Sequence, residues 1–502
     1  MNNSKEKIIT IDISSNSIKT GLISTNLELE SSNKQALKID NEDLDGFAKT
    51  IDMLDLWNKI VLGIKQLLKS SRNDDLKIIG ISTCAQRIAT VFLDKSGDIL
   101  YAGPNTDLRG IDSAYLIEDS FSEEELFKIT AHNPSLLFCL ARLLWFKEEK
   151  EEVYGRIHKL LMLDDWLIYK LTGILCTDLT SIAESQLVDI KKAKWSREIT
   201  EVFKINPNIF PPIIETGSQV GFLKSNLQQK FNIKYNEIPV IKNGADTQTS
   251  LLGMGAIEKT DLGISLGTTA PLHLILDKPY IDPELNFWTT FHSIPNTWIL
   301  EAHAGNTGAS YNWFKTNILS NLSENPDLLI DQYLRNSKPG ALSTFAYLGP
   351  ELMNIKDQTS IKRGVFVFPP PMMISDALPK IYDFTRSIIE NIAFGIYENY
   401  KALLNFPISK VFCAGGMAKS VEILKIIANV LGIDIIVPEI KDSSFIGAAM
   451  SALKALDYYK DYVSIIKENL KFNTISKEKT MVDNYKHIYL QWKNIKNKID
   501  IL

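Results

Sequence analysis

Strands and helices alternate along almost the whole chain, and this alternation limits the possible folds more than any other feature. β-Branched runs at 7–13 and 77–81 predict strands. Apolar residues at helical spacing over 53–70 predict a helix. Further helices are predicted at 246–256, 306–320, 384–405 and 418–432. Interleaving of this kind indicates the α/β class.

A weak internal repeat suggests two similar lobes. Residues 8–23 and 262–276 both have the pattern of strand, small-residue turn, strand. A length of 502 residues leaves room for about two to four domains. We therefore expect domains at 1–254 and 255–455, followed by a helical tail at 456–502 packed on or near the second lobe.

Charge and cysteine content exclude several classes of protein. Lys and Arg total 55 against 60 Asp and Glu, a net charge of −5, which argues against binding nucleic acid through bulk charge. No segment reaches the roughly 18 apolar residues of a membrane span. The four cysteines form no CxxC pair, so we expect neither disulfides nor a zinc site, and a cytoplasmic location.

Two acidic motifs could carry chemistry. Asp12 ends a strand before a turn of small hydroxyl residues that includes Ser15 and leads to Lys19. Such a turn can offer N–H groups to a phosphate, and the carboxylate can bind Mg²⁺; alternatively, Asp12 caps its own loop. Asp246, between a strand and a helix, could accept a proton from a hydroxyl or simply cap the helix.

Two glycine-containing loops and two polar loops complete the set. Gly267-Thr268-Thr269 and Gly415-Gly416-Met-Ala418 follow strands and could approach a nucleotide closely, or serve only as a hairpin turn and the start of a helix. The loops with Gln86-Arg87 and with Asp107 also follow strands. Such loops often line the crevice of an open α/β sheet, although solvated loop charges explain them equally well.

Taken together and in order, these segments resemble the FGGY family of carbohydrate kinases. The resemblance covers about residues 7–455. Its segments are Asp12-Ile-Ser-Ser-Asn-Ser-Ile-Lys19, Ala85-Gln-Arg-Ile88 with Asn105-Thr-Asp-Leu-Arg109, Trp166–Gly173 with Thr177-Asp178, Gly244-Ala-Asp-Thr-Gln248, Ser265–Thr269, Gly415–Ser420 and Ser444–Ala449.

The resemblance implies a fold and a reaction. The fold would be two actin-like, ribonuclease-H-like lobes that face a central cleft, with the sugar mainly on the first lobe and ATP mainly on the second. The reaction would be ATP-dependent phosphorylation of a small sugar or polyol, without nucleic acid or membrane partners. Family members are often dimers or tetramers, so a homodimer is one possible assembly that the resemblance implies.

The resemblance also assigns roles to residues. Asp246 would be the general base and would bind substrate and Mg²⁺. Asp12 would hold Mg²⁺. Substrate would contact Gln86, Arg87 and Asp107. ATP would contact Ser15, Lys19, Gly267, Thr268, Thr269, Gly415, Gly416 and Ala418.

Three positions depart from the family pattern. Ser14 replaces the usual Gly, where a Cβ could crowd the phosphate or change the turn. Asn105 stands where Trp is common and Ile88 where glycerol kinases have Glu, so the substrate is left open. Ser14 also supports the alternative function, an actin-like ATP-binding sensor or decayed kinase without phosphotransfer. Scattered histidines without GxSxG or HExxH patterns argue against a hydrolase.

Overall fold

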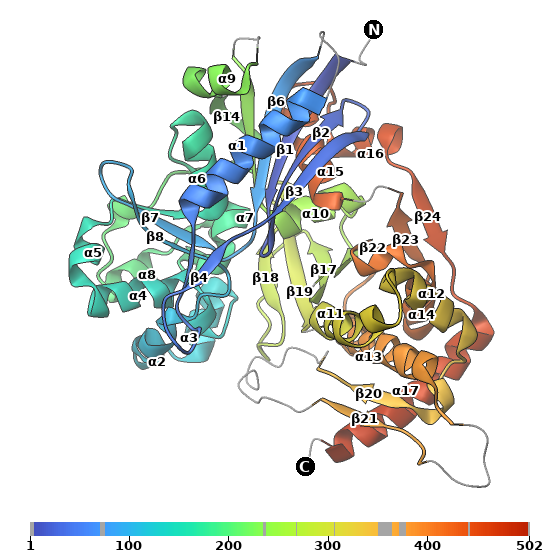
Figure 1. Ribbon diagram of the computed structural model, residues 1–502. Coiled ribbons are helices and arrows are strands. Elements are labelled where there is room, and N and C mark those ends of the chain that lie inside the picture. The colour runs from blue at the N-terminus through green and yellow to red at the C-terminus, as the bar shows by residue number, and fades with distance from the viewer. Residues whose placement is uncertain are drawn as a thin grey trace. The chain divides into compact units, whose positions relative to one another are not determined.

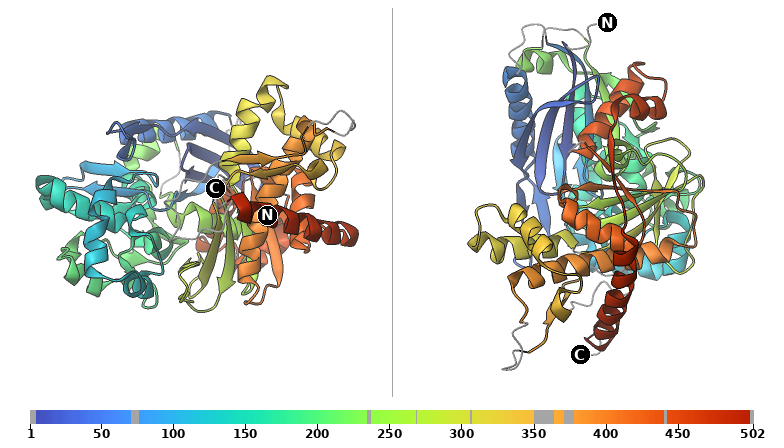
Figure 2. Two further views of the ribbon diagram at one scale, coloured as in Figure 1. Left: turned by 90° about the horizontal axis from the view of Figure 1, so that it is seen from below. Right: turned by 90° about the vertical axis from the view of Figure 1, so that its right-hand side faces the viewer.

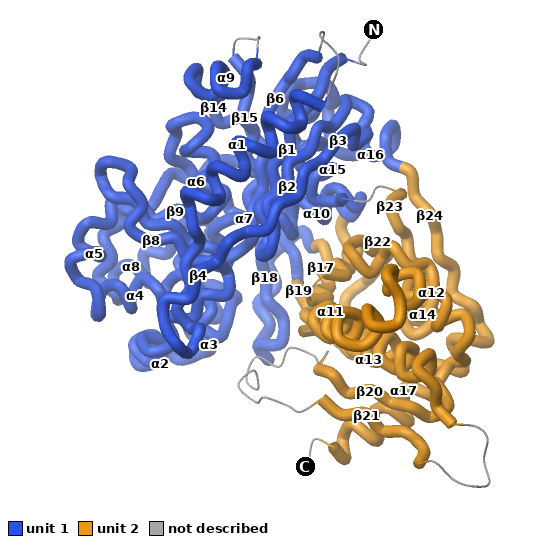
Figure 3. Tube along the Cα trace, in the orientation of Figure 1, with its two compact units in different colours: residues 1–257, 276–300, 442–470 blue, residues 258–275, 301–441, 471–502 orange. Residues whose placement is uncertain are grey.

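The computed structural model (Figure 1) describes residues 5–70, 76–233, 237–267, 269–305, 307–349, 364–370, 378–439 and 442–499. The chain forms two compact units (Figure 3). The first comprises residues 1–257, 276–300 and 442–470, and the second comprises 258–275, 301–441 and 471–502.

The first unit is built on a six-stranded sheet in the order β14-β15-β6-β1-β2-β3. Its strands are β1 (Glu6–Ile13), β2 (Ser17–Ser24), β3 (Leu29–Ala36), β6 (Lys77–Ala85), β14 (Ser218–Phe222) and β15 (Pro239–Ala245). Strands β1, β6 and β15 are parallel neighbours, whereas β2, β3 and β14 run antiparallel to theirs. The three parallel strands therefore end at one edge of the sheet.

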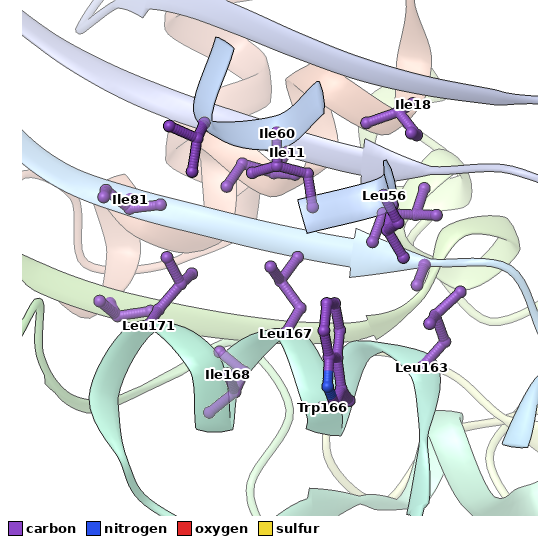
Figure 4. Packing of buried hydrophobic residues seen from close by; sticks show 14 of the residues in the cluster. Ile11, Ile18, Leu56, Ile60, Ile81, Leu163, Trp166, Leu167, Ile168 and Leu171 are labelled. Atoms are coloured by element: carbon purple, nitrogen blue, oxygen red, sulfur yellow. The ribbon is translucent and has the colours of Figure 1, made fainter. Parts of the chain in front are cut away.

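Helices cover both faces of this sheet (Figures 1 and 2). Helices α1 (Met53–Ser70) and α6 (Leu163–Thr172) share one apolar core with the odd-numbered side chains of β1, such as Ile11 (Figure 4). The other face carries α10 (Asp246–Met254) and α15 (Ser443–Ala455); Ser82 of β6 donates a 2.7 Å hydrogen bond to a carbonyl of α15. Even-numbered β1 residues point to this second face because strand side chains alternate.

The remaining elements of the first unit include a three-stranded sheet, β8-β7-β9, with its own apolar core. The strands are β4 (Ile39–Asn41), β5 (Lys49–Ile51), β7 (Thr90–Leu93), β8 (Ile99–Gly103), β9 (Lys159–Met162), β10 (Thr177–Asp178), β11 (Val188–Asp189), β12 (Lys194–Trp195), β13 (Ile213–Ile214) and β18 (Trp288–Phe291). The helices are α2 (Ala114–Ser120), α3 (Glu123–Thr130), α4 (Cys139–Glu149), α5 (Glu151–Arg156), α7 (Leu179–Ile182), α8 (Arg197–Val202), α9 (Ser225–Phe231) and α16 (Tyr462–Asn469).

The second unit has a sheet whose strands run in the order β19-β17-β16-β22-β23-β24. These strands are β16 (Asp261–Leu266), β17 (Ala270–Leu276), β19 (Trp298–Ala304), β22 (Lys410–Gly415), β23 (Ile435–Pro438) and β24 (Phe472–Ile475), and a separate pair is β20 (Phe345–Tyr347) with β21 (Val365–Val367). The helices are α11 (Thr307–Asn317), α12 (Pro326–Asn336), α13 (Ile381–Leu403), α14 (Val421–Leu431) and α17 (Lys479–Ile499).

The two predicted hairpins are confirmed: β1 pairs with β2, and β16 pairs with β17, both antiparallel. Among the described residues, none of the helices combines the length and apolar composition needed to span a bilayer.

The two compact units divide the chain differently from the predicted domains. Residues 442–470 belong to the first unit because α15 packs on α10 and on the first sheet. The predicted tail is therefore divided, since 471–502 belong to the second unit. The tail also contains β24, which pairs with β23 and which its Lys-rich helical pattern did not predict.

Close packing of α10 against α15 gives a testable prediction. A Cβ on Gly447 would overlap the backbone carbonyl of Thr249, whereas a Cβ on Gly155 in α5 would meet nothing within 4 Å. We expect Gly447→Ala to cost about 1–3 kcal/mol or more, as overpacking does. Gly155→Ala should be neutral or stabilising by up to about 1 kcal/mol. Thermal unfolding of both variants checks this, and equal melting temperatures would contradict it.

Candidate functional site

Three residues from distant parts of the sequence meet at one edge of the first sheet. Asp12 lies opposite Cys84 in the pairing of β1 with β6, and Ala85 at the end of β6 lies opposite Ala245 at the end of β15. Arg87 follows β6, and Asp246 follows β15 as the first residue of α10. Parallel strands that end together therefore bring Asp12, Arg87 and Asp246 to the same edge, where ligands bind in open α/β sheets.

Asp12 is buried and faces α15. One oxygen, Oδ2, accepts a 2.8 Å hydrogen bond from Ser444 and lies 3.4 Å from Nζ of Lys19. Lys19 also donates a 2.9 Å hydrogen bond to Asp442. Burial lowers the pKa of Lys19, but the two carboxylates outweigh burial and raise this pKa above its ordinary value. Lys19 is thus a fixed cation beside Asp12.

The turn after β1 connects to the neighbouring loops. The amide of Ser14 donates to the Ser17 carbonyl at 2.9 Å, and the backbone φ of Ser14 is not positive. Ser14 therefore fits its turn without the backbone strain that its substitution for Gly suggested. The side-chain amide of Asn105 donates a 2.8 Å hydrogen bond to Oγ of Ser15. The backbone amide of Asn105 donates a 3.3 Å hydrogen bond to Oε1 of buried Gln86.

Asp246 has a strongly perturbed acidity. Burial raises its pKa to about 7, and the nearby negative charge of Asp12 adds to the effect. The positive charge of Arg87 and hydrogen bonds from Thr247 lower the pKa, but by less. The N-terminus of α10 also favours a carboxylate. At neutral pH, Asp246 is therefore poised to gain or lose a proton.

Arg87 is held by a partner that the sequence did not indicate. Its Nη1 donates a 2.7 Å hydrogen bond to Oε1 of Glu184, whose side chain is only 1% exposed. The two residues are 97 positions apart, and no motif links them in the sequence. Ser444 lies 432 positions from its partner Asp12, and Asp442 lies 423 positions from its partner Lys19. The only sequence feature near Glu184 is the Thr177-Asp178 segment, six residues before it.

Asp107 lies in a different environment from the one predicted. It is fully buried and accepts hydrogen bonds from the Tyr101 hydroxyl, from Nε of Arg109 at 2.8 Å and from the Lys49 amide at 2.8 Å. Nε of Arg142 lies 3.8 Å away. With so many donors converging on it, Asp107 stabilises the loop after β8, and we do not assign it to substrate.

The second unit brings the two glycine-containing loops together. Strands β16 and β22 are parallel and in register, with Leu266 opposite Gly415, so both loops leave the same edge of this sheet. Gly267 in one loop and Gly416 in the other have open space around them. Among the described residues other than the chain neighbours, the nearest atom to an added Cβ would be 3.8 Å away at Gly267 and 4.0 Å away at Gly416. Thr269 and Ala418 lie in these loops; Thr268 lies outside the described residues.

The acidic edge of the first unit fits a hard cation. Oδ1 of Asp12 is buried and has no hydrogen-bond partner among the described residues. Within the same described ranges, no group of three or more His, Cys, Asp or Glu residues could hold a metal. One or two carboxylates without a complete protein cage are typical of Mg²⁺ that also binds substrate phosphates.

Comparison with known proteins places this geometry in context. Models of the FGGY family of carbohydrate kinases match residues 7–253 (N-terminal domain) and 262–456 (C-terminal domain). The "Putative sugar kinase YoaC" of Bacillus subtilis is 27% identical over 88% of both chains. Xylulose kinase of Lactococcus lactis is 26% identical over 85% of this chain and 84% of its own. The crystal structure of gluconate kinase from Lactobacillus acidophilus has a TM-score of 0.85 at 20% identity and covers 98% of both chains.

Adjacent glycines in the second unit provide a matched test of loop geometry. Gly415 has φ +118°, and a Cβ there would lie 2.5 Å from the Leu266 carbonyl oxygen. Gly416 has φ −62° and open surroundings. We expect Gly415→Ala to destabilise the protein by about 2 kcal/mol or more, and Gly416→Ala by less than about 1 kcal/mol. Differential scanning calorimetry tests this; a Gly416 variant that is the less stable of the two would contradict it.

Proposed function

Since the chain belongs to the FGGY family of carbohydrate kinases, we propose that it transfers the γ-phosphoryl group of ATP to a hydroxyl of an uncharged sugar or polyol, with Asp246 as general base. The observation that carries this proposal is the meeting of Asp12, Arg87 and Asp246 at the common end of three parallel strands. Polar and charged groups converge there from segments that family members use for substrate.

Asp246 would remove the proton of the attacking hydroxyl. A carboxylate with a pKa of about 7 is a stronger base than an ordinary Asp, yet it remains ionised in about half of the molecules at neutral pH. A positioned base of this kind contributes roughly 10²–10⁴ in rate. Arg87, fixed by Glu184, would orient substrate hydroxyls, with Gln86 beside it.

Asp12 would bind Mg²⁺ through its oxygen Oδ1, directly or through water, and Asp246, whose carboxylate interacts electrostatically with Asp12, would help to hold the ion. Bound Mg²⁺ would neutralise charge on the phosphates. Lys19, 3.4 Å from Oδ2 of Asp12, would orient the carboxylate. Ser15 would offer donors to phosphate from the turn after β1. In the second unit, Gly267, Thr269, Gly415, Gly416 and Ala418 would contact the nucleotide, and Thr268 would assist them.

The charges around Arg87 favour an uncharged acceptor. Glu184 already neutralises its guanidinium at 2.7 Å, and Lys19 is already shared by two carboxylates. Asp12, Asp246 and Glu184 would repel a further carboxylate. We therefore propose a ketose or polyol rather than an aldonate. We also propose a cytoplasmic location, because all four cysteines are buried free thiols.

The first prediction from the proposed function concerns turnover. Mg·ATP with a panel of polyols, ketoses, aldonates and the autoinducer-2 precursor should give substrate-dependent ADP release. Asp246→Asn should lower kcat by roughly 10²–10⁴. Because the base must be ionised, kcat/KM of the wild type should fall about tenfold per pH unit below a pKa of about 7 and level off above it.

The residual rate of Asp246→Asn is the control, and it should not vary across this pH range. An unchanged rate in Asp246→Asn would eliminate Asp246 as the base. Binding of ATP without any stimulated turnover would instead favour a sensor, and Ser14→Gly would then test whether the departure at this turn is responsible.

The second prediction concerns charge selectivity. The wild type should prefer the best uncharged substrate over its aldonate counterpart by at least about tenfold in kcat/KM, a difference of about 1.4 kcal/mol. Glu184→Gln should shift this ratio toward the aldonate by about tenfold, because Arg87 loses its charge partner. A wild type that prefers the aldonate would overturn the proposed substrate class.

A further inference from the structure

A buried ionic cluster lies directly beneath the loop that carries Asp246. Nζ of Lys242 in β15 lies 2.8 Å from Oδ2 of Asp164, 2.8 Å from Oδ1 of Asp165 and 2.7 Å from Oδ2 of Asp178. All four side chains are at most 2% exposed. Burying such groups is unfavourable unless they are well paired, so their geometry is tightly determined.

The cluster has one ammonium for three carboxylates, and its protonation reflects this imbalance. Burial raises the pKa of Asp164 and raises that of Asp165 to about 6, although Lys242 opposes both shifts. Burial also acts on Asp178, but Lys242 and hydrogen bonds from Thr180 and Ser181 outweigh it, and the pKa of Asp178 is lowered. The Lys242 ammonium therefore keeps a carboxylate partner even when one of the three aspartates is protonated.

Hydrogen bonds also fix each of the three residues between Lys242 and Asp246. The Asn243 side chain donates a 2.7 Å hydrogen bond to Oγ of Ser82 and a 3.0 Å hydrogen bond to the Thr83 carbonyl. The Gly244 amide donates 3.0 Å to Oδ2 of Asp164. The Ala245 amide donates 3.1 Å to Oγ1 of Thr180.

Gly244 is the position where this loop approaches the cluster most closely. Its φ of +72° is unfavourable for other residues, and a Cβ there would overlap Thr180 and Asp178. The backbone therefore rests directly on the cluster two residues before Asp246. Because a displacement of about 1 Å at a reacting group can cost 10²-fold in rate, this support matters for catalysis.

We propose that Asp164 is a positioning residue: it couples the Lys242 cluster to the Gly244 amide and so fixes the start of α10, where Asp246 acts. The inference rests on the proposed function, since it assigns the loop a catalytic purpose. Asp164 does not contact Asp246 itself; it acts through the backbone of the loop.

Asp165 provides a matched control. Both aspartates lie in the first turn of α6, both pair with Lys242 at 2.8 Å, and each accepts one backbone amide. Asp165 accepts the Met162 amide at 2.8 Å and thereby caps its own helix. Only Asp164 reaches the loop before Asp246. Removing either carboxylate leaves Lys242 with two carboxylates and the Ser181 hydroxyl as partners.

The experiment compares Asp164→Ala, Asp164→Asn and Asp165→Ala with the wild type. We expect Asp164→Ala to lower kcat at least tenfold with KM for Mg·ATP within about twofold. Asp164→Asn keeps a carbonyl oxygen for the Gly244 amide and should recover kcat to within about threefold of the wild type. Asp165→Ala should reduce the melting temperature about as much as Asp164→Ala, yet change kcat less than threefold.

Hydrogen exchange of the segment 240–250 gives a readout that does not depend on activity. Exchange should accelerate in Asp164→Ala and remain unchanged in Asp165→Ala. Equal kcat losses in the two alanine variants, or no faster exchange in Asp164→Ala, would overturn the positioning role alone. A wild type without sugar-dependent turnover, or with turnover that survives Asp246→Asn, would instead overturn the proposed function and with it the catalytic purpose of the loop.

Discussion

Parallel pairing of β1, β6 and β15 is the constraint on which the candidate site depends. Parallel strands must be joined by long crossovers, so the three strand ends come from positions near 13, 85 and 245. Hydrogen-bond register then fixes these ends side by side. The helices on both faces bury the sheet and prevent it from shifting, because a slip of one residue would turn Asp12 from α15 toward the apolar core.

The pKa of Asp246 at this edge of the sheet follows from its burial and from the unequal pairing of the nearby carboxylates with cations. Asp12 has a nearby cation in Lys19, whereas Arg87, the cation that lowers the pKa of Asp246, is already paired with Glu184. Desolvation therefore dominates at Asp246 and raises its pKa. Deeper in the unit the balance differs: Lys242 is surrounded by three aspartates that it holds together.

The sequence predicted the elements well where periodicity was strong. Helix 53–70 coincides with α1, because its apolar pattern matches the face that is buried. Motif order also led to Asp12, Arg87 and Asp246. Long-range pairings were not predictable. Glu184 and Asp442 have no local signature, and the segment that begins at Ser444 gave no indication that Ser444 would pair with Asp12. Asp107 in a polar loop gave no sign of the arginines that surround it. Such pairings depend on tertiary packing rather than on spacing in the sequence.

The interrupted first unit has a consequence for biosynthesis. Its last helices, α15 and α16, are encoded after nearly all of the second unit, and α15 supplies both the partner of Asp12 and the surface against which α10 packs. A chain emerging from the ribosome N-terminus first must therefore leave the part of the sheet that α15 covers exposed until about residue 455 has been made. During that interval the surface that α15 will cover is a natural target for chaperones, and premature termination before α15 yields an incomplete core rather than a shorter working enzyme.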